Sequence, residues 1–241
     1  MIENFHPDII GIANPDTIFD GSFVRKVKEV FAEKPDYAVL TGFQLDIFGR
    51  SGGHPFWEDE SSPGTILKVA LYGASIRPLR ILLEKFLPRQ DYKSYVEGVR
   101  NSKYIPHQVW AVEGSVFFIR ASDFESVGFF DDNIFLYYEE NILAFKIDRQ
   151  LHKKIGVINT ITYVHAHKPY PEELTSDVIR RRMNVIKIAG VSSQYYFSHY
   201  VTGSKFLHVV HKILVKLGYI RLYFSYRAKM LVQKLRKKRA G

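Results

Sequence analysis

The sequence predicts an α/β protein followed by basic amphipathic helices. A strand, a turn, a helix and a second strand follow one another between residues 8 and 43, an order typical of α/β layers with some parallel strands. Hydrophobic residues make up 46% of the chain and aromatic residues 15%, enough for a packed core and against disorder. After Asp177 the remaining 64 residues contain no Asp or Glu. These three observations give the fold class.

The first elements are the clearest. Residues 8–13 predict a short buried strand that ends at Asn14-Pro15-Asp16, and residues 37–43 predict a second strand. Asp20 can cap a helix over residues 21–34. Helical spacing places four apolar side chains on one face: Phe23, Val27, Val30 and Phe31.

The later elements follow the same signals. Residues 45–62, rich in Gly, Pro and charge, predict a loop, and Ser122 with Glu125 forms a capping-box pattern. Extended segments are expected at 108–112, 116–120, 155–157 and 161–165. Helices are expected at 65–86 with a break near Pro78, at 135–150, and from 171 onward with breaks near Gly190 and Gly203.

The net charge of +9 is unevenly spread. Residues 205–239 contain 11 of the 34 Lys and Arg residues, which leaves 23 bases against all 25 acids. Such a tail is attracted to phosphate-rich surfaces: anionic lipid, nucleic acid or acidic substrates. The chain has no cysteine, which excludes disulfides and thiolate metal sites. It has neither a signal-peptide pattern at its start nor an apolar run long enough to predict a membrane-spanning helix.

Three groups of residues can carry chemistry. Asp16 follows a buried strand, where α/β proteins bind ligands, and its carboxylate suits Mg²⁺ or Mn²⁺; taken alone, the motif is more often an ordinary Asn-Pro-Asp turn. Glu139 and Glu140 lie among large apolar residues, which would raise their pKa and suit a general base; they could also simply begin a solvated helix. His165 and His167 share one face of a strand and could bind a metal, or lie at the surface.

The order of these segments resembles a known family. Asn14-Pro15-Asp16, then WAVEGSVFFIR (110–120), then GFFDDNIFLYYEENILA (128–144), then Tyr163-Val164-His165 are similar to inverting family 2 glycosyltransferases. The likeness is greatest to bacterial rhamnosyltransferase-like enzymes of capsule, exopolysaccharide and O-antigen assembly, and it covers about residues 5–170. It implies a GT-A fold, which is a Rossmann-like α/β layer, and a sugar transfer from a nucleotide-sugar donor to a glycan or lipid-linked saccharide.

The resemblance also implies roles for individual residues. Asp16 would bind the metal and the donor diphosphate, with Asn14 in the first position of the triplet, and His165 would be a further metal contact, with His167 as the alternative. Glu140 would be the general base and Glu139 its acidic neighbour near the acceptor. Three residues would line the sugar: Trp110, Gly114 and Ser115. The chain departs from the family pattern at two positions. Asn14 replaces the first Asp of the triplet, and Glu140 replaces the Asp that acts as the general base.

A larger departure lies at the start of the chain. Members of the family have roughly 70–90 further residues before the equivalent of Ile9, which form the strands that read the nucleobase. The sequence therefore predicts a partial GT-A sheet lacking its N-terminal strands, over residues 1–170, and a helical, membrane-associating region over 171–241. A separately encoded nucleotide-binding chain is one expected partner. The alternative is a truncated remnant without activity, or a subunit that binds membrane or acceptor.

The basic segment over residues 205–239 predicts where in the cell the protein acts. Phe206, Val210, Ile213, Leu217, Ile220 and Phe224 recur at helical spacing among basic residues. This pattern is typical of a helix lying in a membrane interface, which suits an enzyme with a lipid-linked acceptor on the cytoplasmic face of the cell membrane. A soluble helix with a solvated basic face is the alternative. No nucleic-acid-binding motif accompanies the charge, and nucleic acid is not an expected partner.

Overall fold

The structure is a computed structural model, and it describes residues 6–51, 56–87, 92–166 and 173–240, with side chains up to residue 236. The chain forms two compact units. The sheet unit comprises Met1–Glu60, Asp91–Asp131 and Glu139–Lys168; the helical unit comprises Ser61–Gln90, Asp132–Tyr138 and Pro169–Gly241. The boundary expected at residue 170 thus marks only the last segment of the helical unit, because two earlier segments pack with it.

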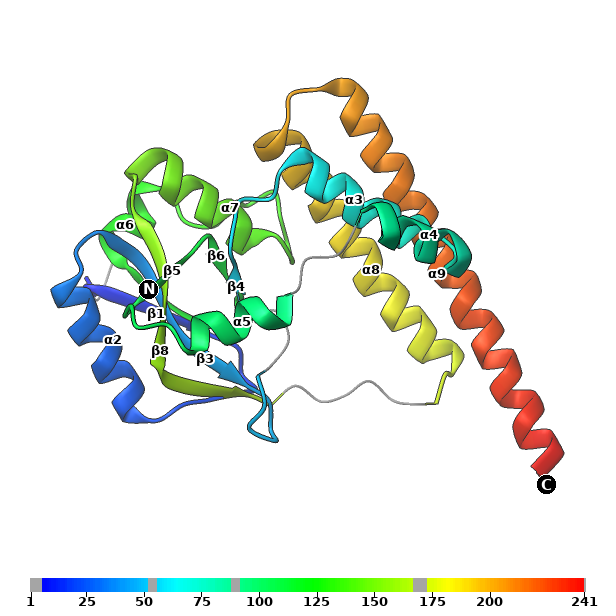
Figure 1. The fold of residues 1–241 in the computed structure, drawn as a ribbon, viewed down its shortest axis with the longest axis horizontal. Helices are drawn as coiled ribbons and strands as arrows, with labels where there is room; N and C mark the ends of the chain where they lie inside the picture. Colours follow the sequence, from blue (N-terminus) through cyan, green and yellow to red (C-terminus); the bar gives the residue numbers. More distant parts are fainter. Residues whose placement is uncertain (1–5, 52–55, 88–91, 167–172, 241) are drawn as a thin grey trace. The chain divides into compact units, whose positions relative to one another are not determined.

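The sheet unit is built on a mixed sheet (Figure 1). Its order is β1-β7-β3-β8-β2, with β5 also paired to β8. The strands are β1 (Ile9–Ala13), β2 (Thr17–Ile18), β3 (Tyr37–Leu45), β5 (His107–Val109), β7 (Val116–Arg120) and β8 (Lys154–His165). A separate ribbon pairs β4 (Phe56–Trp57) with β6 (Ala111–Val112).

The strand directions define one functional edge of the sheet. β7 is antiparallel to both β1 and β3, and β3 is parallel to β8. The carboxyl ends of β1, β3 and β8 therefore lie together, at the edge where β7 begins. We call it the carboxyl edge. Ligands of open α/β sheets bind outside the carboxyl ends of the strands.

Helices cover both faces of this sheet (Figure 1). On one face, α2 (Gly21–Glu33) buries the four expected side chains, Phe23, Val27, Val30 and Phe31, against β3, β7 and β8. Its cap is as predicted, since the Asp20 carboxylate accepts the backbone N–H groups of Ser22 and Phe23. The opposite face packs against α5 (Tyr92–Arg100), α6 (Ala121–Ser126) and α7 (Glu139–Lys146).

Some element predictions are corrected. The helix expected over 135–150 begins only at Glu139, as α7, and continues as a π-helical segment, η1 (Ile147–Leu151). Tyr137 and Tyr138 both have a φ of 69°, a left-handed conformation that a right-handed helix cannot include. Ser122 lies inside α6 and does not cap it, because the N-cap position is Arg120.

Two expected breaks are also absent. The strands predicted at 155–157 and 161–165 are one strand, β8, with a register shift in its pairing to β3. The break expected near Gly190 does not occur, since α8 (Ser176–Tyr196) runs through it. A Cβ on Gly190 would lie 3.0 Å from Val215, so this glycine serves a close helix contact. The break near Gly203 is confirmed.

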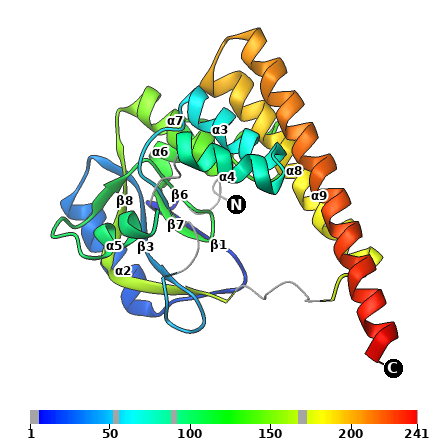
Figure 2. The same cartoon turned by 45° about the vertical axis from the view of Figure 1, so that its right-hand side comes forward.

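The helical unit contains α3 (Pro63–Ala74), α4 (Arg77–Phe86), α8, the π-helical segment η2 (Phe197–Val201) and α9 (Lys205–Ala240). Figures 1 and 2 show α8 and α9 side by side, with α3 against α9. A Cβ on Gly218 of α9 would lie 3.2 Å from the backbone of Gly73 in α3, so the glycine at position 218 lets these helices touch. Among the described residues, no helix combines the length and the apolar character that crossing a bilayer requires.

Candidate functional site

Asp16 and His165, the two predicted metal ligands, lie next to each other at the carboxyl edge. The short pairing of β2 with β8 sets Thr17 opposite His165, and the Ala166 N–H donates to the Asp16 carbonyl at 2.8 Å. As a result, the Asp16 Oδ1 and His165 Nε2 atoms are 3.4 Å apart. His167, the alternative ligand, lies outside the described residues.

Gln44, at the end of β3, holds the ring of His165 from the other side. Its carboxamide Nε2 lies 2.9 Å from His165 Nδ1, and its buried Oε1 has no hydrogen-bond partner. If the side-chain amide of Gln44 is rotated by 180°, Gln44 Oε1 accepts a hydrogen bond from the Nδ1–H of His165. The lone pair of His165 Nε2 then faces Asp16. Metal-binding histidines are usually oriented by such a second contact.

The Asp16–His165 pair could supply two ligands of a metal site. Carboxylate oxygen is a ligand that Mg²⁺ and Mn²⁺ prefer, and neutral imidazole is a common metal ligand. Within the described part of the chain, no group of three or more His, Cys, Asp or Glu side chains could hold a metal. These cations are commonly bound by one or two carboxylates together with substrate phosphates and water. The pair therefore fits a divalent cation that a diphosphate helps to hold.

Glu140 is fixed by Gly114. The backbone N–H of Gly114 donates to Glu140 Oε1 at 2.8 Å. A Cβ at position 114 would lie 2.3 Å from the same oxygen, so only glycine leaves room for this carboxylate. Sequence reasoning expected Gly114 to make room for a sugar; in the structure, the space beside its Cα is taken by Glu140.

The surroundings of Glu140 suit a proton acceptor. Burial raises the pKa of the Glu140 carboxyl from 4.5 to about 7, and the negative charges of Glu139 and Glu113 add to this effect. Burial also raises the pKa of Glu139, whose Oε2 is buried without a hydrogen-bond partner. A general base works best when its pKa is near the working pH. Glu113 was not identified from the sequence, because nothing in its local pattern distinguishes it from the other acidic residues.

Ser115 connects the two halves of this edge. Its carbonyl accepts the Asn14 N–H at 2.8 Å, and its hydroxyl lies 2.7 Å from the Tyr163 hydroxyl, two residues before His165. Because Gly114 precedes it, this residue joins the Glu140 contact to the turn that carries Asp16. The Ser115 side chain is fully buried, unlike the sugar-lining position expected for it. Asn14 is exposed and orders the turn, since its carbonyl accepts from Thr17.

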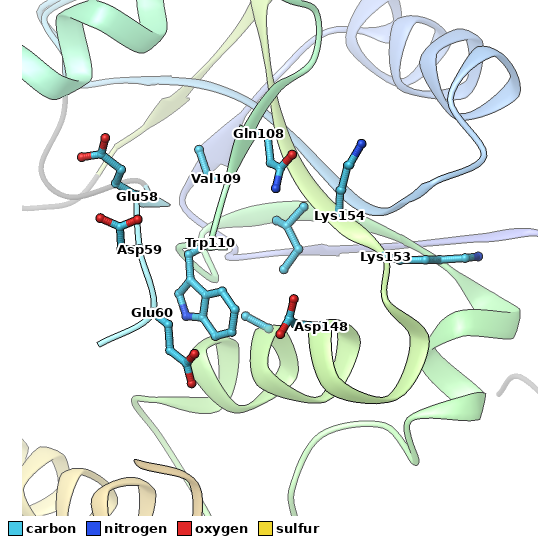
Figure 3. A pocket seen from close by; sticks show the side chains of 11 residues that line it. Glu58, Asp59, Glu60, Gln108, Val109, Trp110, Asp148, Lys153 and Lys154 are labelled. Atoms are coloured by element: carbon cyan, nitrogen blue, oxygen red, sulfur yellow. The ribbon is translucent and has the colours of Figure 1, made fainter. Parts of the chain in front are cut away.

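Trp110 belongs to a different pocket. A cavity of about 310 Å³ is lined by residues that include Trp110, Ala144 and Asp148, together with the segment Glu58, Asp59 and Glu60. Figure 3 shows Trp110 at the centre of this lining, with the three acidic residues on one side. Arg149 pairs with Glu60 at 2.7 Å and with Asp148 at 3.1 Å. None of Asp16, Glu140 and His165 lines it.

The structure thus brings six of the predicted residues to one edge: Asn14, Asp16, Gly114, Ser115, Glu140 and His165. Gln44 and Tyr163, which support them, were not predicted. The signal for Gln44 was present, as the one amide side chain in the mostly apolar strand YAVLTGFQL. Comparison with protein-family models and with curated proteins found no match to this chain.

Proposed function

We propose that the chain is the catalytic part of an inverting glycosyltransferase of the GT-A type, which moves a sugar from a nucleotide-sugar donor to a glycan or lipid-linked saccharide. One observation carries this proposal: a carboxylate–imidazole pair and a buried carboxylate with a pKa of about 7 share the carboxyl edge of one sheet. Single-displacement transfer needs both groups, one facing the leaving diphosphate and one facing the acceptor hydroxyl.

Each residue has a defined task in this reaction. Asp16 and His165 would hold a Mg²⁺ or Mn²⁺ ion, which when bound supplies Lewis-acid stabilisation to the leaving diphosphate. Glu140 takes the proton of the acceptor hydroxyl as that oxygen attacks the anomeric carbon from the face opposite the leaving group. Gly114 keeps the carboxylate in place through its N–H. Glu139, by its charge, keeps the pKa of Glu140 high.

The two units suit different partners. The helical unit contains 20 of the 34 Lys and Arg residues and five of the 25 acids, whereas the sheet unit has 14 bases and 20 acids. A strongly basic unit supports attachment to an anionic membrane surface, where a lipid-linked acceptor would be found. Nucleotide binding is expected to need further strands beside β1, supplied by another segment or chain.

The test measures the transfer of sugar from a panel of labelled nucleotide sugars in the presence of Mn²⁺. The membranes used contain lipid-linked acceptors and come from cells that express the chain in its native context. We expect Glu140→Gln to lower transfer by about a hundredfold or more while donor binding stays within about twofold. Glu33→Gln, at an exposed acid on α2, is the matched control.

The outcomes separate the proposal from its alternative. Equal loss of transfer and of donor binding in Glu140→Gln would contradict the role of the base. Vesicle binding without any donor binding or transfer would favour a membrane- or acceptor-binding subunit.

A further inference from the structure

Helix α4 (Arg77–Phe86) belongs to the helical unit and leaves its apolar face exposed to solvent. Not one of its ten residues is buried. Its apolar side chains recur at helical spacing on one face, and they remain open to solvent: Leu82 is 51% exposed and Phe86 75% exposed. Leu79 is exposed on the same face, and Leu83 partly so.

Helix α4 touches the rest of the protein along one flank, where Arg80 and Leu83 are partly buried. Arg80 is partly buried and donates to the Ser75 carbonyl at 3.4 Å. At the far end of the helix, the Tyr72 hydroxyl donates to the Leu87 carbonyl. An ordinary surface helix buries its apolar face instead. These contacts leave the apolar face of α4 outward.

Arg80 and Arg221 place two cations beside this helix. Arg221 donates to the Gly73 carbonyl at 2.7 Å, and its pKa is lowered by burial and by the nearby charge of Arg80. Within the part of the chain that the structure describes, neither guanidinium forms an ion pair with an acid. Two neighbouring cations without a carboxylate attract an anion.

We propose that α4 lies in the interface of an anionic lipid bilayer, with Leu79, Leu82 and Phe86 among the acyl chains and its basic residues at the headgroup phosphates. Apolar side chains on one face and basic residues beside them are what such a surface binds. The positive charge of the helical unit argues against the helical unit of a second copy as the occupant, because two such units repel each other. This inference specifies the membrane attachment of the proposed function and is tested without any transfer reaction.

The absence of cysteine from the sequence allows a direct test in the full chain. Single variants Leu82→Cys and Phe86→Cys, on the apolar face, and Arg77→Cys and Lys85→Cys, on the basic face, are labelled with an environment-sensitive fluorophore. Each is mixed with vesicles of phosphatidylcholine alone or with phosphatidylglycerol. We expect a blue shift at positions 82 and 86 with the anionic vesicles only, and little shift at 77 and 85.

Binding strength provides the second measurement. Phe86→Ser is expected to lower partitioning onto phosphatidylglycerol vesicles by about tenfold, since it removes a large apolar side chain from the interface. Phe48→Ser is the matched control: Phe48 is 73% exposed and belongs to the sheet unit, so this variant should bind as the unchanged chain does.

Three results would overturn the inference. The first is vesicle binding with no shift at positions 82 and 86, which would leave α9 as the attaching helix. The second is an equal shift on both faces of α4. The third is a shift that grows with protein concentration without vesicles, which would mean that a second copy covers the face.

Discussion

At the scale of single residues, Glu140 links the stability of the protein to pH. Its carboxyl pKa is about 7 in the folded chain and about 4.5 when exposed to water. The folded state thus holds the proton more tightly. The stabilisation from this group is complete below about pH 4.5 and is lost as the pH rises through 7, by at most about 3 kcal/mol.

The variant Glu140→Gln removes this dependence. We expect the free energy of unfolding of the unchanged chain to fall between pH 5 and pH 8 by about 1–3 kcal/mol more than that of the variant, because the amide does not ionise. Denaturant unfolding at several pH values measures the difference. Parallel pH profiles for the two proteins would mean that the carboxyl ionises as it does in water.

Gly114 has a testable role at the same scale. In Gly114→Ala the new Cβ would lie 2.3 Å from Glu140 Oε1, so the carboxylate must leave its contact with the backbone N–H. We expect a loss of about 1–3 kcal/mol in the free energy of unfolding.

The matched control is Gly98→Ala in α5, where a Cβ meets nothing within 4 Å. Alanine in an open helix interior should stabilise the protein, by up to about 1 kcal/mol. If both variants behave alike, Gly114 does not hold the Glu140 carboxylate in place.

At the scale of elements, the α3–α9 contact depends on one glycine more than on its neighbour. A Cβ on Gly218 would lie 3.2 Å from the backbone of Gly73, whereas a Cβ on Gly73 meets nothing within 4 Å. We expect Gly218→Ala to lower the melting temperature of the helical unit and Gly73→Ala to leave it equal or higher. Thermal unfolding followed by circular dichroism compares them; the reverse order would show that the helices pack differently.

How far the sequence predicts an element depends on where the deciding contact lies. The helix α2 was predicted with its cap and its buried face, because Asp20 and four apolar residues lie within fourteen residues of each other. The predicted start of α7 was wrong, because nothing in the sequence indicates the left-handed conformation of Tyr137 and Tyr138. Likewise, the continuity of α8 through Gly190 depends on Val215, which is distant in sequence.

The same reasoning applies to the candidate site. Residue types and their order pointed to Asp16, Glu140 and His165, but they could not give the contact of Gly114 with Glu140 or that of Gln44 with His165. Both contacts join residues far apart in the chain, at separations of 26 and 121 positions. Trp110 and Ser115 were expected to share the site with them. In the structure, Trp110 lines another pocket, and the side chain of Ser115 is buried.

At the scale of the whole molecule, charge and chemistry are divided between the units. The groups with catalytic potential lie in the acidic sheet unit, and the excess of positive charge lies in the helical unit. Under the proposed function, the basic helical unit would attract an anionic membrane without neutralising the carboxylates of the sheet unit. The proposed function therefore depends on whether the sheet unit binds a cation through Asp16 and His165.

The most direct test is a titration of the isotope-labelled chain with Mn²⁺ in the presence of inorganic pyrophosphate, monitored through the broadening of backbone amide signals in NMR spectra. We predict that the amides of Gly114, Ser115 and Ala166 broaden first, that Gly98 in α5 stays sharp, and that Asp16→Asn abolishes the selective broadening. Uniform broadening, or selective broadening that survives in Asp16→Asn, would contradict a metal site beside Glu140.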